Sequence, residues 1–115
     1  MRLTVYHLKN CDTCRKALKA LSASGHEITA LDVRADGVPS VELEKIAKAV
    51  GWEALLNTRS ASWRGLGEEE RADMNKEKAL ALIALYPALM KRPAILGEDA
   101  QITIGWKAAQ QEVWL

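Results

Sequence analysis

The sequence predicts an α/β fold built on a mixed four-stranded sheet, and the order of its elements carries that prediction. A strand, a helix and a second strand follow one another within about the first thirty residues, which is typical of a βαβ unit with a right-handed crossover. Two short strands and a helix close the chain. The middle, at about residues 39–91, is predicted to be a helical insertion packed to one side of the sheet. We expect residues 1–115 to form a single domain.

Composition and charge exclude several classes of protein. The chain has 115 residues, of which 49% are hydrophobic, and this suits a globular domain with its own core. Sixteen Lys and Arg residues balance 15 Asp and Glu, giving a net charge of +1, so direct nucleic-acid binding is not expected. No apolar run approaches the roughly 20 residues of a membrane helix, and the N-terminus lacks the apolar core of a signal peptide. We therefore expect a cytoplasmic protein with no membrane partner.

The first half of the sheet is predicted from short apolar runs. Arg2–Leu8 and Glu27–Val33 are rich in β-forming residues and are predicted to be strands. Between them, apolar residues recur at helical spacing over about Thr13–Ser24, and Gly25 ends this helix.

The rest of the chain is predicted to be mainly helical until a hairpin near its end. The middle elements are a helix from Pro39 to Gly51, a further turn at Trp52–Leu56, a loop at Asn57–Gly67, an exposed helix at Glu68–Met74, a helix capped by Asn75 with Tyr86 on its apolar face, and a short helix begun by Pro87. Ala94–Leu96 and Gln101–Ile104 predict a β-hairpin, and an amphipathic helix follows over about Lys107–Trp114.

Cys11 and Cys14 form a C-x-x-C motif where the first strand gives way to the first helix. Free backbone N–H groups and the positive end of the helix dipole gather at a helix start, and they lower the pKa of a thiol there. Cys11 is therefore the candidate nucleophile. Cys14 lies one turn later on the apolar stripe with Leu18. It is either a resolving cysteine that forms a disulfide with Cys11 or a small core residue.

The cysteines have a competing interpretation as zinc ligands. His7, Cys11, Cys14 and His26 could supply four ligands. The chain has no second C-x-x-C, however, and both histidines lie in or beside predicted strands rather than at ligand spacing. We predict no metal site.

Three arginines are candidates for anion binding. Arg59 and Arg64 lie in the predicted loop, and Arg92 directly precedes Pro93. A guanidinium donates two parallel hydrogen bonds to an oxyanion or carboxylate, although a single arginine is most often a solvated surface residue. Anion binding at the active thiol requires the arginines to converge on Cys11, which spacing cannot show. Pro93 opens a strand and is either a cis proline or part of an ordinary trans turn.

Several segments together resemble the arsenate reductase-like family, which includes the Spx regulators, over almost the whole chain. The matching segments are Tyr6–Thr13 (YHLKNCDT), Leu55–Arg59 (LLNTR), Trp63–Leu66 (WRGL), Lys91–Leu96 (KRPAIL) and Ile104–Lys107 (IGWK). The resemblance implies a thioredoxin-like fold with a helical insertion. In that fold a proline such as Pro93 lies against the active cysteine.

The resemblance also implies a function. The arsenate reductases of the family use one cysteine as nucleophile, and Cys11 matches it. They bind the oxyanion through arginines, two of which match Arg59 and Arg92. Glutathione and glutaredoxin supply the electrons, and no cofactor stays bound. We place Arg64 and Asn10 in the anion site as further candidates.

Two departures from the reductases keep a second function open. Their third arginine has no match, because the chain reads Gly105-Trp106-Lys107 there, and they lack a cysteine at the position of Cys14. Spx regulators carry C-x-x-C and bind the RNA polymerase α subunit. Our first hypothesis is a glutathione-linked thiol oxidoreductase that binds a small oxyanion or glutathione. The alternative is a redox-sensing regulator that binds RNA polymerase and switches on Cys11–Cys14 oxidation.

Overall fold

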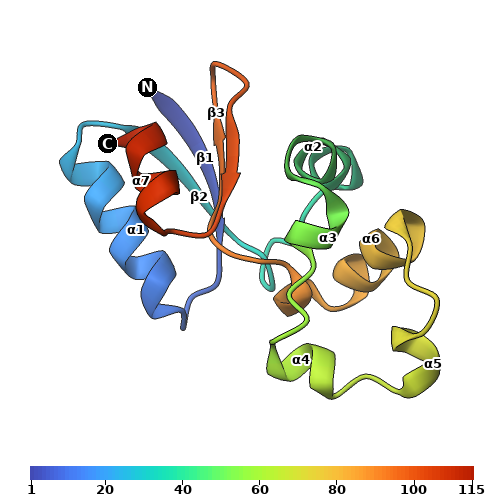
Figure 1. The fold of residues 1–115 in the computed structure, drawn as a ribbon. Coiled ribbons are helices and arrows are strands. Elements are labelled where there is room, and N and C mark those ends of the chain that lie inside the picture. Colours follow the sequence, from blue (N-terminus) through green and yellow to red (C-terminus); the bar gives the residue numbers. More distant parts are fainter.

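Four strands form one mixed sheet, in the order β2-β1-β3-β4, in the computed structural model, which describes residues 1–115 (Figure 1). β1 (Arg2–His7) is central, runs parallel to β2 (Glu27–Asp32) and is antiparallel to β3 (Ala94–Gly97). β4 (Ile102–Ile104) pairs antiparallel with β3 at the edge. The predicted mixed four-stranded sheet is confirmed.

One face of the sheet is covered by α1 (Asp12–Ala23) and α7 (Ala108–Trp114) (Figure 1). A cluster of five buried side chains fills this layer: Leu3, Val5, Leu21, Ile95 and Trp114. The indole Nε1 of Trp114 donates to Thr103 Oγ1 at 2.8 Å, and the carbonyl oxygen of Trp114 lies 2.6 Å from the imidazole Nε2 of His26. These two contacts hold the C-terminal helix against the sheet.

Helices from the middle of the chain lie on the opposite side of the sheet, where the first of them faces the strands and the others extend beyond it (Figure 1). These elements are α2 (Ser40–Val50), α3 (Trp52–Leu55), α4 (Ala61–Arg64), α5 (Glu68–Arg71), α6 (Lys76–Leu85) and the 3₁₀ helix η1 (Pro87–Leu89). Buried residues of α2, α3, α6, η1 and the adjoining loops form a cluster of 14 with Tyr6, Val33 and Ala94 of the sheet region, and this cluster is the larger part of the core. No helix is both long enough and apolar enough to cross a bilayer.

Two local predictions in this middle region are wrong. The predicted loop Asn57–Gly67 contains the helix α4, because the Ser60 hydroxyl accepts a hydrogen bond from the backbone N–H of Trp63 at 3.1 Å and so caps a helical turn. Tyr86 does not extend the apolar face of α6. It is the residue that ends this helix, and 44% of its surface is exposed.

Candidate functional site

Cys11 lies at the N-cap of α1, just beyond the end of β1. Its backbone N–H donates to the carbonyl oxygen of Leu8 at 3.1 Å, which closes a turn after the strand. The N–H of Lys9 donates to Asp32 Oδ2 at 3.0 Å, so the same turn is tied to the end of β2. The backbone of Cys11 is extended, with φ −108° and ψ 114°, as is usual for an N-cap residue. The sulfur therefore occupies the position of a capping oxygen.

The surroundings of Cys11 favour its thiolate. Partial burial raises the pKa of Cys11, but four contributions lower it: hydrogen bonds from the backbone N–H and the thiol of Cys14, the positive charge of Arg92, and the backbone N–H of Thr13. The net pKa lies below the ordinary value of a cysteine. Since the thiolate is the nucleophilic form, Cys11 is the more reactive of the two cysteines.

Cys14 is fully buried on the core face of α1 and still contacts Cys11. Burial, together with the hydrogen bond to Cys11 and the charge of Cys11, raises the pKa of Cys14 to about 12. Cys14 therefore keeps its proton at neutral pH. Both residues are free thiols. The structure thus places Cys14 at the core position, one of the two alternatives that the sequence left open, and its role as a resolving cysteine stays a prediction.

A groove of about 860 Å³ opens beside the start of α1, where Thr13 lines it. Its charged lining residues are Glu53, Arg59, Lys91, Arg92 and Lys107. None of these five side chains takes part in an ion pair. Cys11 itself does not line the groove, but Arg92 of this groove lowers the pKa of its thiol. Four cations without an ion-pair partner along one groove are suited to hold an anionic ligand.

Arg92 is oriented by the backbone that precedes it. Its Nη1 donates to the carbonyl oxygens of Ala88 and Met90, each at 2.9 Å, and its Nε is buried without a partner. The peptide bond between Arg92 and Pro93 is cis, one of the two alternatives that the sequence left open, and Pro93 is buried. The guanidinium is thus held at the groove next to Cys11, whose pKa it lowers.

Arg59 reaches the same groove because two distant segments pair. The N–H of Asn57 donates to the carbonyl oxygen of Leu89 at 2.7 Å, and the N–H of Lys91 donates to that of Leu55 at 2.9 Å. The side chain of Asn57 then accepts from the N–H of Arg59 at 3.1 Å. The structure thereby brings Arg59 and Arg92 to one groove.

The remaining two candidate residues lie elsewhere. Arg64 does not line the groove, and its Nη1 donates to the carbonyl oxygen of Arg59 at 2.8 Å, where it holds the backbone of that loop. Asn10 lines a separate hollow of about 330 Å³ with Lys9 and Arg34. Neither Asn10 nor Arg64 lines the groove, so the structure does not bring these two candidates together with Arg59 and Arg92.

Comparisons with known proteins decide the family. Residues 6–113 match the sequence model of the ArsC family. The chain belongs to the ArsC family. It is 39% identical to an uncharacterized protein of Haemophilus influenzae, over 96% of both chains. Among solved structures it is similar to the YffB protein, with a TM-score of 0.89 and 29% identity over 98% of both chains. It is also 25% identical to the global transcriptional regulator Spx 2 of Lactococcus lactis, over 98% of this chain and 86% of the regulator.

Membership of the ArsC family and the thioredoxin-like fold are therefore confirmed as predicted. In this ArsC-family chain, Lys107 lines the groove from the segment that follows the last strand, where the sequence lacked a third arginine. Sequence reasoning missed Lys107, Lys91 and Glu53 as groove residues. Lys91 and Lys107 lie within the KRPAIL and IGWK segments, which resemble the family, and this position could have indicated that they line the groove. Glu53 had no such signal.

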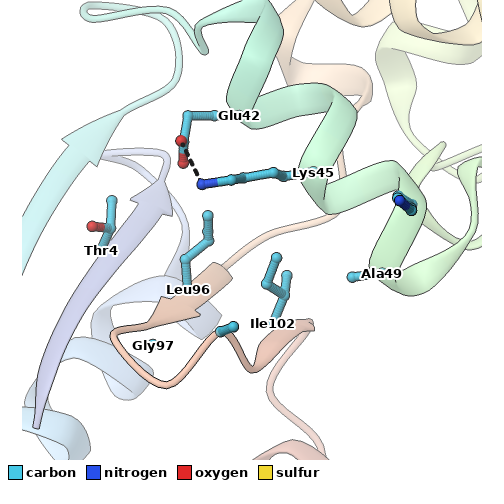
Figure 2. A pocket seen from close by; sticks show the side chains of 9 residues that line it. Thr4, Glu42, Lys45, Ala49, Leu96, Gly97 and Ile102 are labelled. Carbon is cyan, nitrogen blue, oxygen red and sulfur yellow. Dashed lines mark ion pairs between the residues drawn. The ribbon is translucent and has the colours of Figure 1, made fainter.

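A second hollow, of about 500 Å³, lies between α2 and the sheet (Figure 2). Leu96 and Ile102 rise from its sheet side, and Lys45 on α2 forms an ion pair with Glu42 at 3.7 Å. No cysteine or histidine lines this hollow. No group of three or more His, Cys, Asp or Glu residues is arranged to hold a metal ion anywhere in the chain.

Proposed function

We propose that this ArsC-family protein is a glutathione-linked thiol oxidoreductase with Cys11 as its nucleophile. The observation that carries the proposal is a thiol of lowered pKa at the N-cap of a helix whose first turn lines a groove with four unpaired cations, one of which, Arg92, acts on that thiol. The volume of about 860 Å³ lies within the range of roughly 300–1,000 Å³ of pockets that hold small organic ligands. Glutathione carries two carboxylates, which Arg59 and Arg92 are suited to bind.

The reaction proceeds by two thiol–disulfide exchanges. In the first, the thiolate of Cys11 attacks the glutathione sulfur of a mixed disulfide between glutathione and another thiol. The substrate S–S bond breaks, Cys11 becomes bonded to glutathione, and the other sulfur leaves as a thiolate that takes a proton from water. In the second, the thiolate of a free glutathione attacks the glutathione sulfur bonded to Cys11. Glutathione disulfide leaves and the Cys11 thiolate is restored, so one mixed disulfide is reduced for each glutathione disulfide formed.

The chain's own groups have separate tasks in these steps. The hydrogen bonds that the Cys14 N–H and thiol make to Cys11 stabilise its thiolate both before attack and as a leaving group. The arginines orient the peptide so that its sulfur faces Cys11. In this proposal the protein works in the cytosol, where glutathione and glutaredoxin are available as electron donors.

Turnover of a glutathionylated peptide tests the proposal. Consumption of NADPH, coupled through glutathione reductase, is expected with the wild-type protein and not with Cys11→Ser. Val41→Ala, at an exposed position of α2, should behave as wild type. Arsenate, with glutathione and glutaredoxin as donors, is the second substrate to assay, because it tests the small-oxyanion hypothesis on the same thiol. If the protein turns over neither substrate, the proposed activity is wrong.

A second candidate function is redox-controlled binding to RNA polymerase. Two observations favour it: the chain is 25% identical to Spx 2 along nearly its whole length, and Cys11 and Cys14 contact one another at the helix start. The test is capture of the polymerase α subunit by the immobilised protein. The function is supported if oxidation changes capture by the wild-type protein but does not change capture by Cys14→Ala. Equal absence of capture in the reduced and oxidised states would exclude it.

A further inference from the structure

Glu53 is the one carboxylate among the charged residues that line the cationic groove. It lies on α3, its side chain is exposed, and it makes no ion pair with the four cations along the same groove. The groove therefore presents both signs of charge to a ligand, and neither is neutralised by the protein itself.

A carboxylate is unfavourable in a site for a purely anionic ligand. It repels the anion and offsets part of the attraction of the cations. A tetrahedral oxyanion would also fill only a small part of a groove of about 860 Å³. A larger ligand that carries an ammonium group as well as carboxylates meets favourable charges at both positions.

The backbone segments that carry Glu53 and Arg92 are held side by side. The segment that carries Glu53 runs beside the segment that carries Arg92, because Leu56 and Met90 form an antiparallel bridge. Backbone hydrogen bonds at 2.7 and 2.9 Å close this bridge on either side. A ligand that spans the groove therefore meets a preformed pattern of charge rather than two mobile side chains on separate loops.

We propose that Glu53 is an ammonium subsite, which makes the groove selective for a zwitterionic peptide thiol with a free amino group. This proposal rests on the proposed function and deepens it. The carboxylates of the ligand bind the arginines, its sulfur faces Cys11, and its ammonium group lies against Glu53. In glutathione, that ammonium belongs to the γ-glutamyl residue.

The binding test uses S-methylglutathione, which cannot react, and its N-acetyl derivative, which lacks the ammonium charge. Chemical-shift titration of the wild-type protein should give a Kd about three- to fivefold lower for S-methylglutathione, the size expected of one exposed ion pair. Glu53→Gln should remove this difference, and Glu53→Asp should keep part of it. Glu77→Gln, which removes an exposed carboxylate of α6 outside the groove, is the matched control and should leave the difference intact.

The outcomes separate this proposal from the proposed function. Equal affinity of the wild-type protein for the two peptides, or a preference that survives in Glu53→Gln, would overturn the ammonium subsite. A preference that disappears in Glu53→Gln supports the subsite even if turnover is absent, and in that case only the proposed activity fails. When turnover is present, Glu53→Gln should raise the KM for glutathione about three- to fivefold and leave kcat unchanged.

Discussion

The backbone N–H of Cys14 donates a hydrogen bond to the sulfur of Cys11 at 3.4 Å. The thiol of Cys14 acts as a second donor in lowering the pKa of Cys11. The first donor depends only on the start of the helix, whereas the second depends on the identity of residue 14. These two contributions can therefore be separated by mutation.

Cys11 should be labelled as a thiolate at lower pH than a free cysteine. Its pKa is lowered, so the thiolate fraction, and with it the rate of iodoacetamide alkylation, should reach half its maximum below the free-cysteine value of about 8.5. The rate should rise with pH and level off above that midpoint. Cys11→Ser should abolish rapid labelling, because Cys14 is buried and its pKa is raised to about 12. Faster labelling at Cys14 than at Cys11 would contradict the assignment.

Replacing Cys14 by alanine should raise the pKa of Cys11. The variant loses the S–H donor and keeps the backbone N–H, so the alkylation midpoint should move upward without reaching that of a fully unassisted thiol. Cys14→Ser retains a donor and should lie closer to wild type. If both variants titrate like the wild-type protein, the side chain of Cys14 does not stabilise the thiolate.

Mild oxidation should join Cys11 and Cys14 in an intramolecular disulfide. The backbone N–H of Cys14 is hydrogen-bonded to the sulfur of Cys11, so the two thiols are neighbours at the helix start when Cys11 is oxidised to a sulfenic acid or a mixed disulfide. After diamide or peroxide treatment, mass spectrometry should show a monomer that has lost two hydrogen atoms. Detection of glutathionylated or overoxidised Cys11 with Cys14 still free would instead leave a one-cysteine mechanism.

The two groove arginines should respond differently to replacement by lysine. Arg92→Lys loses hydrogen bonds to two backbone carbonyls, so it should lower the free energy of unfolding by about 1–3 kcal/mol as well as weaken anion binding. Arg59→Lys, at an exposed side chain, should weaken sulfate or glutathione binding and leave stability within about 0.5 kcal/mol of wild type. Urea unfolding and chemical-shift titration measure the two effects. A titration that perturbs residues remote from both arginines would show that the anion site lies elsewhere.

Gly97→Ala should destabilise the docking of the C-terminal helix. A Cβ at Gly97 would lie 2.5 Å from Asp99 Oδ1 and 2.8 Å from Cζ3 of Trp114, and the indole is fixed by its hydrogen bond to Thr103. We expect a loss of about 1–3 kcal/mol in the free energy of unfolding, the usual cost of overpacking. Gly67→Ala is the control, because the nearest atom to its Cβ would be Glu70 Oε1 at 3.7 Å. Equal stability of the two variants would show that the Trp114 contact adapts freely.

The order of strands and helices could be predicted because its signals are local. Apolar spacing and Gly25 placed the first helix within one residue of α1, and Asn75 was predicted as a cap and does accept from the N–H of Lys78 at 2.9 Å. The same reasoning failed at Ala61–Arg64, where the serine cap was present but the four-residue helix is too short to show a periodic apolar face.

By itself, the sequence determined that a cysteine stands at the start of a helix after the first strand, because that requires only neighbouring residues. Tertiary structure decided what surrounds that cysteine. Arg59 and Arg92 meet at one groove only because Asn57 and Lys91 make backbone hydrogen bonds across the Leu56–Met90 bridge. Pairing between distant segments depends on how the whole chain packs, and no local pattern encodes it. For the same reason, the sequence predicts Asn10 and Arg64 as residues of the anion site and does not predict Glu53 and Lys107.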